Sequence, residues 1–145
     1  MLKKTVKYAY ISENMPLRLL SIPFFSGSQK DALARIEAFL QAKKGYAHIV
    51  TPNPEMLVRS HSDDAFAQIL KKADLSLCDG VGIEWMLKKK VTRMPGSDMV
   101  LPIASLCAKK NAGIYLVGTG NIETLTKAKE AIEKQLPTAR VVGFH

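Results

Sequence analysis

An aspartate between an apolar run and two glycines is the residue in this sequence best suited to chemistry. Asp79 follows the apolar residues 75–78 and opens the loop Asp79-Gly80-Val81-Gly82. A carboxylate at the end of a strand can act as a general base, and it can also hold a ribose hydroxyl or a metal ion. Gly80 and Gly82 would let a ligand approach the backbone. Alternatively, Asp79 only caps the following helix, since Asp-Gly is also a common turn pair.

Two further polar groups precede this loop in a proline-rich segment. Thr51 and Asn53 stand on either side of Pro52, and the prolines stiffen the segment. Its hydroxyl and amide are therefore preorganised for a sugar or a phosphate, although ordinary cap and turn chemistry explains them equally well.

Arg93 follows the run Lys88-Lys89-Lys90, and an arginine can hold a pyrophosphate in a two-pronged manner. The lysine run itself is typical of a solvated helix end, where it also suits the helix dipole.

A third segment, Gly118-Thr119-Gly120-Asn121, lies between an apolar run and a helical pattern. Backbone N–H groups of such a loop, together with the positive end of the helix, can face an anion, so Gly118 and Gly120 are candidate phosphate-binding residues. The loop is not a complete dinucleotide fingerprint, because the third glycine is absent, and no Walker lysine follows it. A tight strand-to-helix turn capped by Asn121 is the competing explanation.

Alternating apolar runs and amphipathic helical patterns must position these residues. The predicted strands are residues 17–25, 47–50, 75–78, 113–117 and 140–143. The predicted helices are residues 28–44, a short helix from Pro54, residues 63–73, a helix through residues 85–90, and residues 97–110 and 122–135. This alternation predicts an α/β fold with a mostly parallel sheet covered by helices on both faces. Because parallel strands point the same way, all three polar segments are expected at one edge of the sheet.

Composition narrows the choice of function. The chain has 145 residues, 47% of them hydrophobic, and no apolar stretch of the roughly 18 residues that a spanning helix needs. Cys78 and Cys107 lie in apolar runs, which predicts buried free thiols in a reducing compartment. The histidines show no metal-ligand spacing, so no metal site is expected. The net charge of +8 suits nucleotides, nucleic acid or anionic lipid, but no aromatic-basic interleaving indicates a nucleic-acid platform.

Together these segments resemble one family, the WecG/TagA/CpsF glycosyltransferases of bacterial cell-envelope polymer synthesis. The matching segments are Thr51-Pro52-Asn53-Pro54-Glu55-Met56, Ala73-Asp74-Leu75, Asp79-Gly80-Val81-Gly82, Arg93 with Gly96-Ser97-Asp98, Tyr115-Leu116-Val117-Gly118 and Val141-Val142-Gly143. They occur in the family's order over residues 17–145, and this joint match is far more specific than any one motif. The resemblance implies a Rossmann-like sheet within one catalytic domain, residues 17–145. Residues 1–16, which include Lys3, Lys4 and Lys7, are predicted to form a basic arm or an extra strand.

The resemblance also implies a reaction. Family members transfer an N-acetylmannosamine-type sugar, with inversion, from a UDP donor to an N-acetylglucosamine on a polyprenyl diphosphate, for teichoic acid, common antigen or capsule. By this likeness Asp79 is the catalytic base, Thr51 and Asn53 line the sugar pocket, and Arg93 steadies the leaving diphosphate. No cofactor is expected, because arginine and helix N-termini can stabilise that charge without a metal. The implied location is the cytoplasm, peripherally at the inner face of an anionic cell membrane.

Several alternatives stay open at this stage. A nucleotide-binding module without chemistry and, less well supported, a nucleic-acid binder would also suit the charge and the glycine loops. The last predicted strand has only begun at residue 140, so we expect that a natural C-terminal part, with further pocket residues and a membrane-associated appendage, is missing. The exposed apolar surface of an unfinished sheet would allow self-association into a homo-oligomer.

Overall fold

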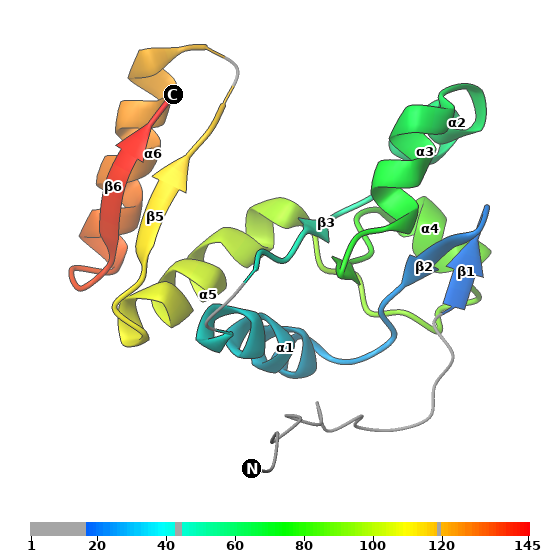
Figure 1. The fold of residues 1–145 in the computed structure, drawn as a ribbon, viewed down its shortest axis with the longest axis horizontal. Helices are drawn as coiled ribbons and strands as arrows, with labels where there is room; N and C mark the ends of the chain where they lie inside the picture. Colours follow the sequence, from blue (N-terminus) through cyan, green and yellow to red (C-terminus); the bar gives the residue numbers. More distant parts are fainter. Residues whose placement is uncertain (1–16, 43–44, 119) are drawn as a thin grey trace, which may run out of the picture.

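A computed structural model describes residues 17–42, 45–118 and 120–145. The predicted basic arm, residues 1–16, the last two residues of the predicted helix 28–44 and Thr119 lie outside the described residues. Helices and strands alternate along the chain (Figure 1), which confirms the mixed α/β class. In order they are β1 (Leu17–Leu19), β2 (Ile22–Phe24), α1 (Gln29–Gln41), β3 (Ile49–Val50), α2 (Pro54–Ser62), α3 (Asp64–Lys71), β4 (Leu75–Ser76), α4 (Val81–Met86), α5 (Gly96–Lys109), β5 (Gly113–Leu116), α6 (Ile122–Gln135) and β6 (Arg140–Phe144).

The first predicted strand, residues 17–25, is a hairpin instead. Strands β1 and β2 pair antiparallel, with Leu17 opposite Phe24. Leu20 and Ser21 form the turn, and both have left-handed φ angles, of 50° and 65°. Tight hairpin turns favour such angles but usually recruit glycine or asparagine for them. Because neither residue is present, residue types at this turn do not indicate the reversal of the chain.

Strand β4 has hydrogen-bonded neighbours on both sides. On one side it pairs with β3, where Ile49 is opposite Leu75, and the ladder continues past the strand ends as the Leu77 N–H donates to the Val50 carbonyl at 2.8 Å. On its other side the Ser76 carbonyl accepts a hydrogen bond of 2.9 Å from the Phe25 N–H. The chain that follows β4 is therefore fixed from both sides.

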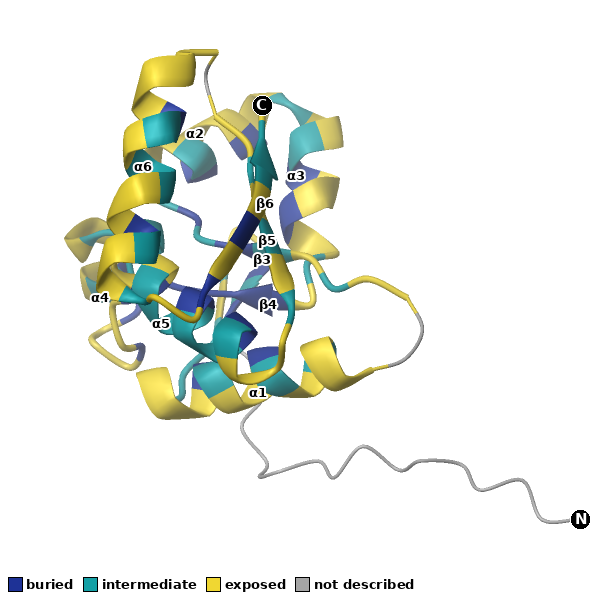
Figure 2. Ribbon diagram, turned by 90° about the vertical axis from the view of Figure 1, so that its left-hand side faces the viewer, coloured by how far each residue is buried: buried dark blue, intermediate teal, exposed yellow. Residues whose placement is uncertain are grey.

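Both faces of this sheet are covered by helices, as predicted. Leu75 and Leu77 pack on one face with buried residues of α1 and α5, including Ile36 and Met99. Cys78 packs on the opposite face with buried residues of α2, α3 and α4. The alternation of neighbouring residues between two cores is the period of an extended strand. Figure 2 shows β4 in the colour of buried residues, within these two layers of helices.

Strands β5 and β6 form a separate parallel sheet. Ile114 is opposite Val141, and a register shift follows between Ile114 and Tyr115. Among the described residues the strands make three two-stranded sheets, β1–β2, β3–β4 and β5–β6. The predicted parallel pairing is thus confirmed within two of them, whereas the single Rossmann-like sheet is not. Figure 1 shows β5, β6 and α6 together at one side of the molecule, joined to the rest through α5.

Local capping chemistry sets the helix starts. The Ser28 side chain accepts from the Asp31 N–H, and the Asp31 carboxylate accepts from the Ser28 N–H, which makes a capping box at the start of α1. Asn53 caps α2, with Pro54 in its first turn, as predicted. Helix α6 has the predicted bounds, residues 122–135, with Asn121 as its cap. Helix α5 starts one residue earlier than predicted, because Pro95 rather than Ser97 stands before its first turn.

Two helical predictions are wrong in detail. The helix predicted through residues 85–90 ends at Met86, because Lys88 and Lys89 take left-handed φ angles of 53° and 56°. The helix predicted over residues 63–73 is shorter, since α3 ends at Lys71, and within it the apolar Ile69 is 50% exposed whereas Ala67 is buried. Short helices carry few turns, so the apolar positions alone do not fix which side faces the core.

Candidate active site

Asp79 lies just beyond β4, held through both its backbone and its side chain. Its N–H donates to the Pro52 carbonyl at 3.1 Å, which extends the β3–β4 ladder by one more rung. Its carboxylate Oδ2 accepts a hydrogen bond of 3.4 Å from the N–H of Gly96, the first residue of α5. The side chain is half-buried. Asp79 does not cap α4, whose N-cap is Gly80 without a side-chain bond, so the capping alternative fails for this residue.

Thr51 lies beside the same helix start. A Cβ built on Gly96 would lie 3.1 Å from Thr51 Oγ1, so these two residues are in close contact. The ends of β3 and β4 and the beginning of α5 therefore converge on one small region that contains a hydroxyl, a carboxylate and a helix N-terminus. Gly96 was not predicted as a site residue. In the sequence, Gly96 is a glycine that follows a proline at a helix start. This pattern points to a site residue only once the contact with Thr51 is known.

Gly80 and Gly82 bring the two polar loops together. Gly80 has a φ of +118°, and a Cβ on it would lie 3.1 Å from the Pro54 ring. A Cβ on Gly82 would lie 3.2 Å from the same ring. The absence of side chains at both positions lets the first turn of α2 pack against the loop after Asp79. The two glycines thus have a packing role next to the site, in addition to the ligand access that the sequence suggested.

Asn53 uses its side-chain oxygen within the protein. The Oδ1 atom accepts from the Met56 N–H at 2.8 Å, which is the cap of α2. Ordinary cap chemistry therefore accounts for this oxygen, and the amide nitrogen is the part of the side chain that remains for a ligand. The residue is half-buried, and its loop position next to Pro52 keeps it adjacent to the backbone partner of Asp79.

Arg93 lies on the segment that runs next to the end of β4. It forms an isolated parallel bridge with Cys78, and the following N–H, of Met94, donates to the Cys78 carbonyl at 2.7 Å. Arg93 is exposed, and none of the ion pairs found among the described residues includes it. Its guanidinium is thus placed near the Asp79 end of the sheet and is available to an anion.

Gly118 and Asn121, in the glycine loop after β5, have contacts within their own sheet and helix. The Gly118 N–H donates to the His145 carbonyl at 3.0 Å, so it is already paired. A Cβ on Gly118 would lie 2.8 Å from Leu125 of α6, which gives the glycine a packing role. Asn121 caps α6 by accepting from the Thr124 N–H at 3.2 Å. These contacts of Gly118 and Asn121 fit the tight-turn explanation, and the contacts found around Asp79 involve two of the three polar segments.

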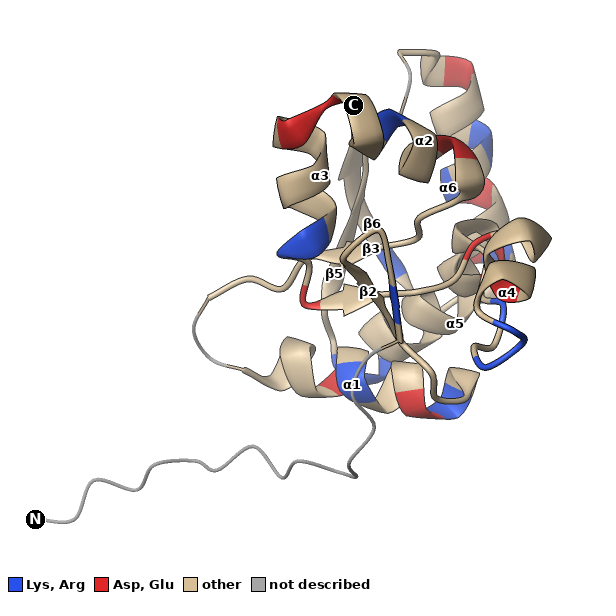
Figure 3. Cartoon of the chain, turned by 90° about the vertical axis from the view of Figure 1, so that its right-hand side faces the viewer, with Lys and Arg blue, Asp and Glu red and all other residues tan. Residues whose placement is uncertain are grey.

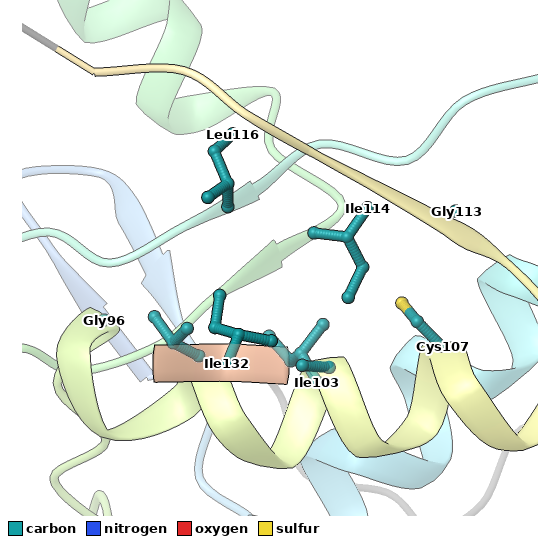
Figure 4. A pocket seen from close by; sticks show the side chains of 9 residues that line it. Gly96, Ile103, Cys107, Gly113, Ile114, Leu116 and Ile132 are labelled. Carbon is teal, nitrogen blue, oxygen red and sulfur yellow. The ribbon is translucent and has the colours of Figure 1, made fainter. Parts of the chain in front are cut away.

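An apolar cavity of about 370 Å³ lies along α5. It lies between α5, β5 and α6, and its walls include Ile103, Cys107, Ile114 and Ile132 (Figure 4). Gly96 is the residue of the Asp79 region that lines it, among the residues that the structure describes. Its walls carry no charged side chain, so this cavity does not suit a sugar nucleotide.

Both cysteines are buried free thiols, as predicted. Burial raises the pKa of the Cys78 thiol to about 11, with smaller contributions from the Glu84 and Asp79 carboxylates, whereas Arg93 acts in the opposite direction. Burial likewise raises the pKa of the Cys107 thiol. Both thiols are protonated at neutral pH, so neither is an activated nucleophile.

Over residues 17–42, 45–118 and 120–145, no cluster of His, Cys, Asp and Glu is placed to hold a metal, and no helix is long and apolar enough to cross a membrane.

Comparison with known proteins points to one family. The model of the glycosyl transferase WecG/TagA/CpsF family matches residues 17–145. Two curated relatives are N-acetylglucosaminyldiphosphoundecaprenol N-acetyl-beta-D-mannosaminyltransferases. That of Bacillus spizizenii is 24% identical over 111 residues, covering 73% of this chain and 42% of the relative. That of Bacillus subtilis is 22% identical over 128 residues, covering 86% of this chain and 50% of the relative. The chain thus spans about half the length of the curated relatives it matches.

Proposed function

Because this chain belongs to the WecG/TagA/CpsF family of glycosyl transferases, we propose that its Asp79 region catalyses transfer of an N-acetylmannosamine-type sugar. The donor is a UDP-sugar, and the acceptor is an N-acetylglucosamine linked to a polyprenyl diphosphate. The transferred sugar and the acceptor correspond to the names of the two Bacillus relatives, whereas the UDP donor follows from the family resemblance. It takes its site from one observation, the convergence of Thr51, Asp79 and the start of α5.

In the proposed mechanism Asp79 is the general base. A sugar hydroxyl is a poor nucleophile, so removal of its proton as it attacks lowers the barrier. The acceptor oxygen forms a bond to the anomeric carbon of the donor while the bond from that carbon to UDP breaks, which inverts the centre. The acceptor proton passes to Asp79. The hydrogen bond from Gly96 to Oδ2 orients the carboxylate and leaves Oδ1 to receive this proton.

The remaining site residues have supporting roles in this proposal. Negative charge develops on the leaving UDP, and the Arg93 guanidinium is suited to stabilise it in the absence of a metal. The Thr51 hydroxyl and the Asn53 amide meet the sugar, and Gly80 and Gly82 shape the floor beside it by admitting Pro54. The proposed mechanism assigns no role to Gly118 or Gly120, since the Gly118 N–H is paired with the His145 carbonyl and β5 belongs to the other sheet. The proposed location is the cytoplasmic face of the membrane that carries the acceptor.

A turnover assay with UDP-N-acetylmannosamine and a soluble lipid-linked acceptor analogue tests the proposal. Asp79→Asn keeps the size of the side chain and an oxygen for the Gly96 N–H but removes the base. Transfer should fall by about 10²- to 10⁴-fold, while UDP binding and thermal stability stay close to those of the unmodified protein. Equal transfer by both proteins would refute the role of Asp79. UDP binding without any transfer by the unmodified protein would instead support the alternative, a nucleotide-binding module without chemistry.

A further inference from the structure

The surface formed by α4 and the turn after it combines exposed apolar and basic side chains. We call it the α4 surface, and it consists of Val81, Trp85, Met86, Lys88, Lys89 and Lys90. Trp85, the only tryptophan in the chain, is 69% exposed, Met86 is 52% exposed and Val81 is 46% exposed. A large aromatic side chain left this open in a folded domain calls for a partner, especially where other apolar side chains adjoin it.

The inner side of α4 fixes the outward direction of these residues. Ile83 and Leu87, four residues apart, are buried in the same core as Cys78. Val81 and Trp85, also four residues apart, therefore share a different side of the helix, which faces solvent. The helix starts two residues after Asp79. The α4 surface and the candidate active site consequently lie on adjoining parts of the molecule.

The lysines are held in a defined turn rather than at a frayed helix end. Lys88 and Lys89 both have left-handed φ angles, which side chains other than glycine rarely adopt. Two backbone hydrogen bonds keep this turn in place, from Lys88 to the Trp85 carbonyl at 2.9 Å and from Lys89 to the Glu84 carbonyl at 2.7 Å. Figure 3 shows the turn as a blue loop that projects directly after α4.

The charge of this surface is positive. Lys88, Lys89 and Lys90 are exposed and appear in none of the ion pairs found among the described residues. Arg93 is exposed nearby along the same segment. The acidic residue on α4 is Glu84, which is half-buried. Lysine is depleted in the cores of protein interfaces, whereas tryptophan beside lysine is typical of surfaces that meet the headgroup layer of a membrane.

We propose that the α4 surface docks the protein onto an anionic lipid bilayer. Trp85 and Met86 enter the interfacial layer, and the three lysines lie against the anionic headgroups. The docking requires no turnover, but its use rests on the proposed function, because it would hold Asp79 next to the plane in which a polyprenyl diphosphate presents its sugar. In this proposal residues 81–90 bind the membrane, and they do so separately from the residues that carry out the reaction.

Vesicle binding tests the proposal without any sugar nucleotide. The unmodified protein is mixed with vesicles of phosphatidylcholine alone or of phosphatidylcholine with phosphatidylglycerol, and both sedimentation and tryptophan fluorescence are followed. Since Trp85 is the only tryptophan, its emission reports on this surface alone. We expect co-sedimentation and a blue shift with the anionic vesicles only. Replacement of Lys88, Lys89 and Lys90 together by glutamine should lower the partition coefficient by about a hundredfold, since each lysine near an anionic surface contributes about 1 kcal/mol.

A matched variant controls for total charge. Glutamine at Lys71, Lys72 and Lys134, which are exposed elsewhere, removes the same charge and should leave binding nearly unchanged. Trp85→Ala should weaken sedimentation with anionic vesicles about tenfold or more while retaining the folded state, because the side chain it removes is exposed. Equal loss in both lysine variants, or binding without a blue shift, would overturn the proposal. A blue shift that depends on protein concentration and needs no vesicles would also overturn it, in favour of a second copy of the chain.

This outcome is independent of the proposed function. Loss of vesicle binding in every form of the protein, together with transfer that still depends on Asp79, would refute docking and leave the transferase intact. If docking depends on the three lysines but the protein transfers no sugar, the docking proposal is supported and the transferase proposal is refuted.

Discussion

The ends of β4 and β5 begin from similar sequence and reach different outcomes. Each strand is an apolar run that leads into a glycine-containing loop and then a helix. After β4, the chain is flanked by β3 on one side and by Phe25 and the Arg93 segment on the other, and Asp79 emerges among them. After β5, the loop has β6 as its strand neighbour, and the His145 carbonyl takes the Gly118 N–H. A strand end becomes a candidate site when neighbouring chain ends converge on it, which the motif alone does not specify.

Burial follows the same division. Both residues of β4 are buried, whereas β5 alternates between exposed and half-buried positions, and Figure 2 shows the contrast in colour. The apolar cavity between α5 and β5 adds to this difference in burial, because it leaves a gap in the packing of β5 against α5. The comparison therefore predicts that substitutions near Asp79 change chemistry, while equivalent substitutions near β5 and β6 change stability or nothing.

The largest expected contrast is between two exposed arginines. Arg93→Gln removes the cation proposed to stabilise the leaving UDP, so the turnover number for transfer should fall by about 10²-fold. Arg140→Gln, on β6, should leave transfer unchanged. Both side chains are exposed, so the free energy of unfolding should change by no more than about 0.5 kcal/mol in either variant. Steady-state kinetics and thermal denaturation measure both quantities, and equal turnover numbers for the two variants would remove Arg93 from the site.

Two glycines provide the next contrast. Gly96→Ala places a methyl group 3.1 Å from Thr51 Oγ1 at the residue that also holds Asp79. A displacement of about 1 Å at a reacting centre can lower the rate by about 10²-fold, so we expect a fall of ten- to a hundredfold in transfer. Gly118→Ala places a methyl group 2.8 Å from Leu125, which should cost about 1–3 kcal/mol of stability through overpacking. Transfer per folded molecule should then be normal for Gly118→Ala, and a loss there would show that the two regions act together.

Two asparagine caps allow a finer separation. Asn53 and Asn121 cap their helices with similar hydrogen bonds, of 2.8 and 3.2 Å. Replacement of either by alanine should cost about 1 kcal/mol of unfolding free energy. Asn53→Asp and Asn121→Asp keep a cap oxygen and should restore that stability. Only Asn53→Asp should still slow transfer, by several-fold, because it lacks the amide nitrogen proposed to meet the sugar. Full recovery of transfer in Asn53→Asp would mean that Asn53 is a cap and nothing more.

The features predicted from sequence are those that local chemistry determines. The cap chemistry of Asn53 and Asn121 could be foreseen because a cap needs only its own helix. The turns at Leu20-Ser21 and Lys88-Lys89 were missed, since those residues adopt left-handed angles that tertiary contacts impose and residue type does not announce. The neighbours of each strand were also beyond prediction, because apolar runs show that strands exist and leave their order open. The proximity of Asp79 and Thr51 followed from parallel pairing, whereas Gly96 depends on where α5 packs.

The smallest expected effect concerns the thiol of Cys78, directly before Asp79. Its pKa is raised to about 11 from an ordinary value of 9.0, mainly by burial. The folded protein therefore holds the thiol proton more tightly than the unfolded chain does. The resulting stabilisation is complete below pH 9 and is lost as the pH rises toward 11. The difference in unfolding free energy between the unmodified protein and Cys78→Ala should shrink over this range, as measured by urea denaturation at several pH values.

Burial also protects the Cys78 thiol from reagents. Cys78 should therefore react with a disulfide reagent at pH 8 only after the protein unfolds. Rapid labelling of the native protein would instead show that the end of β4 opens, and that the contrast with β5 is one of degree.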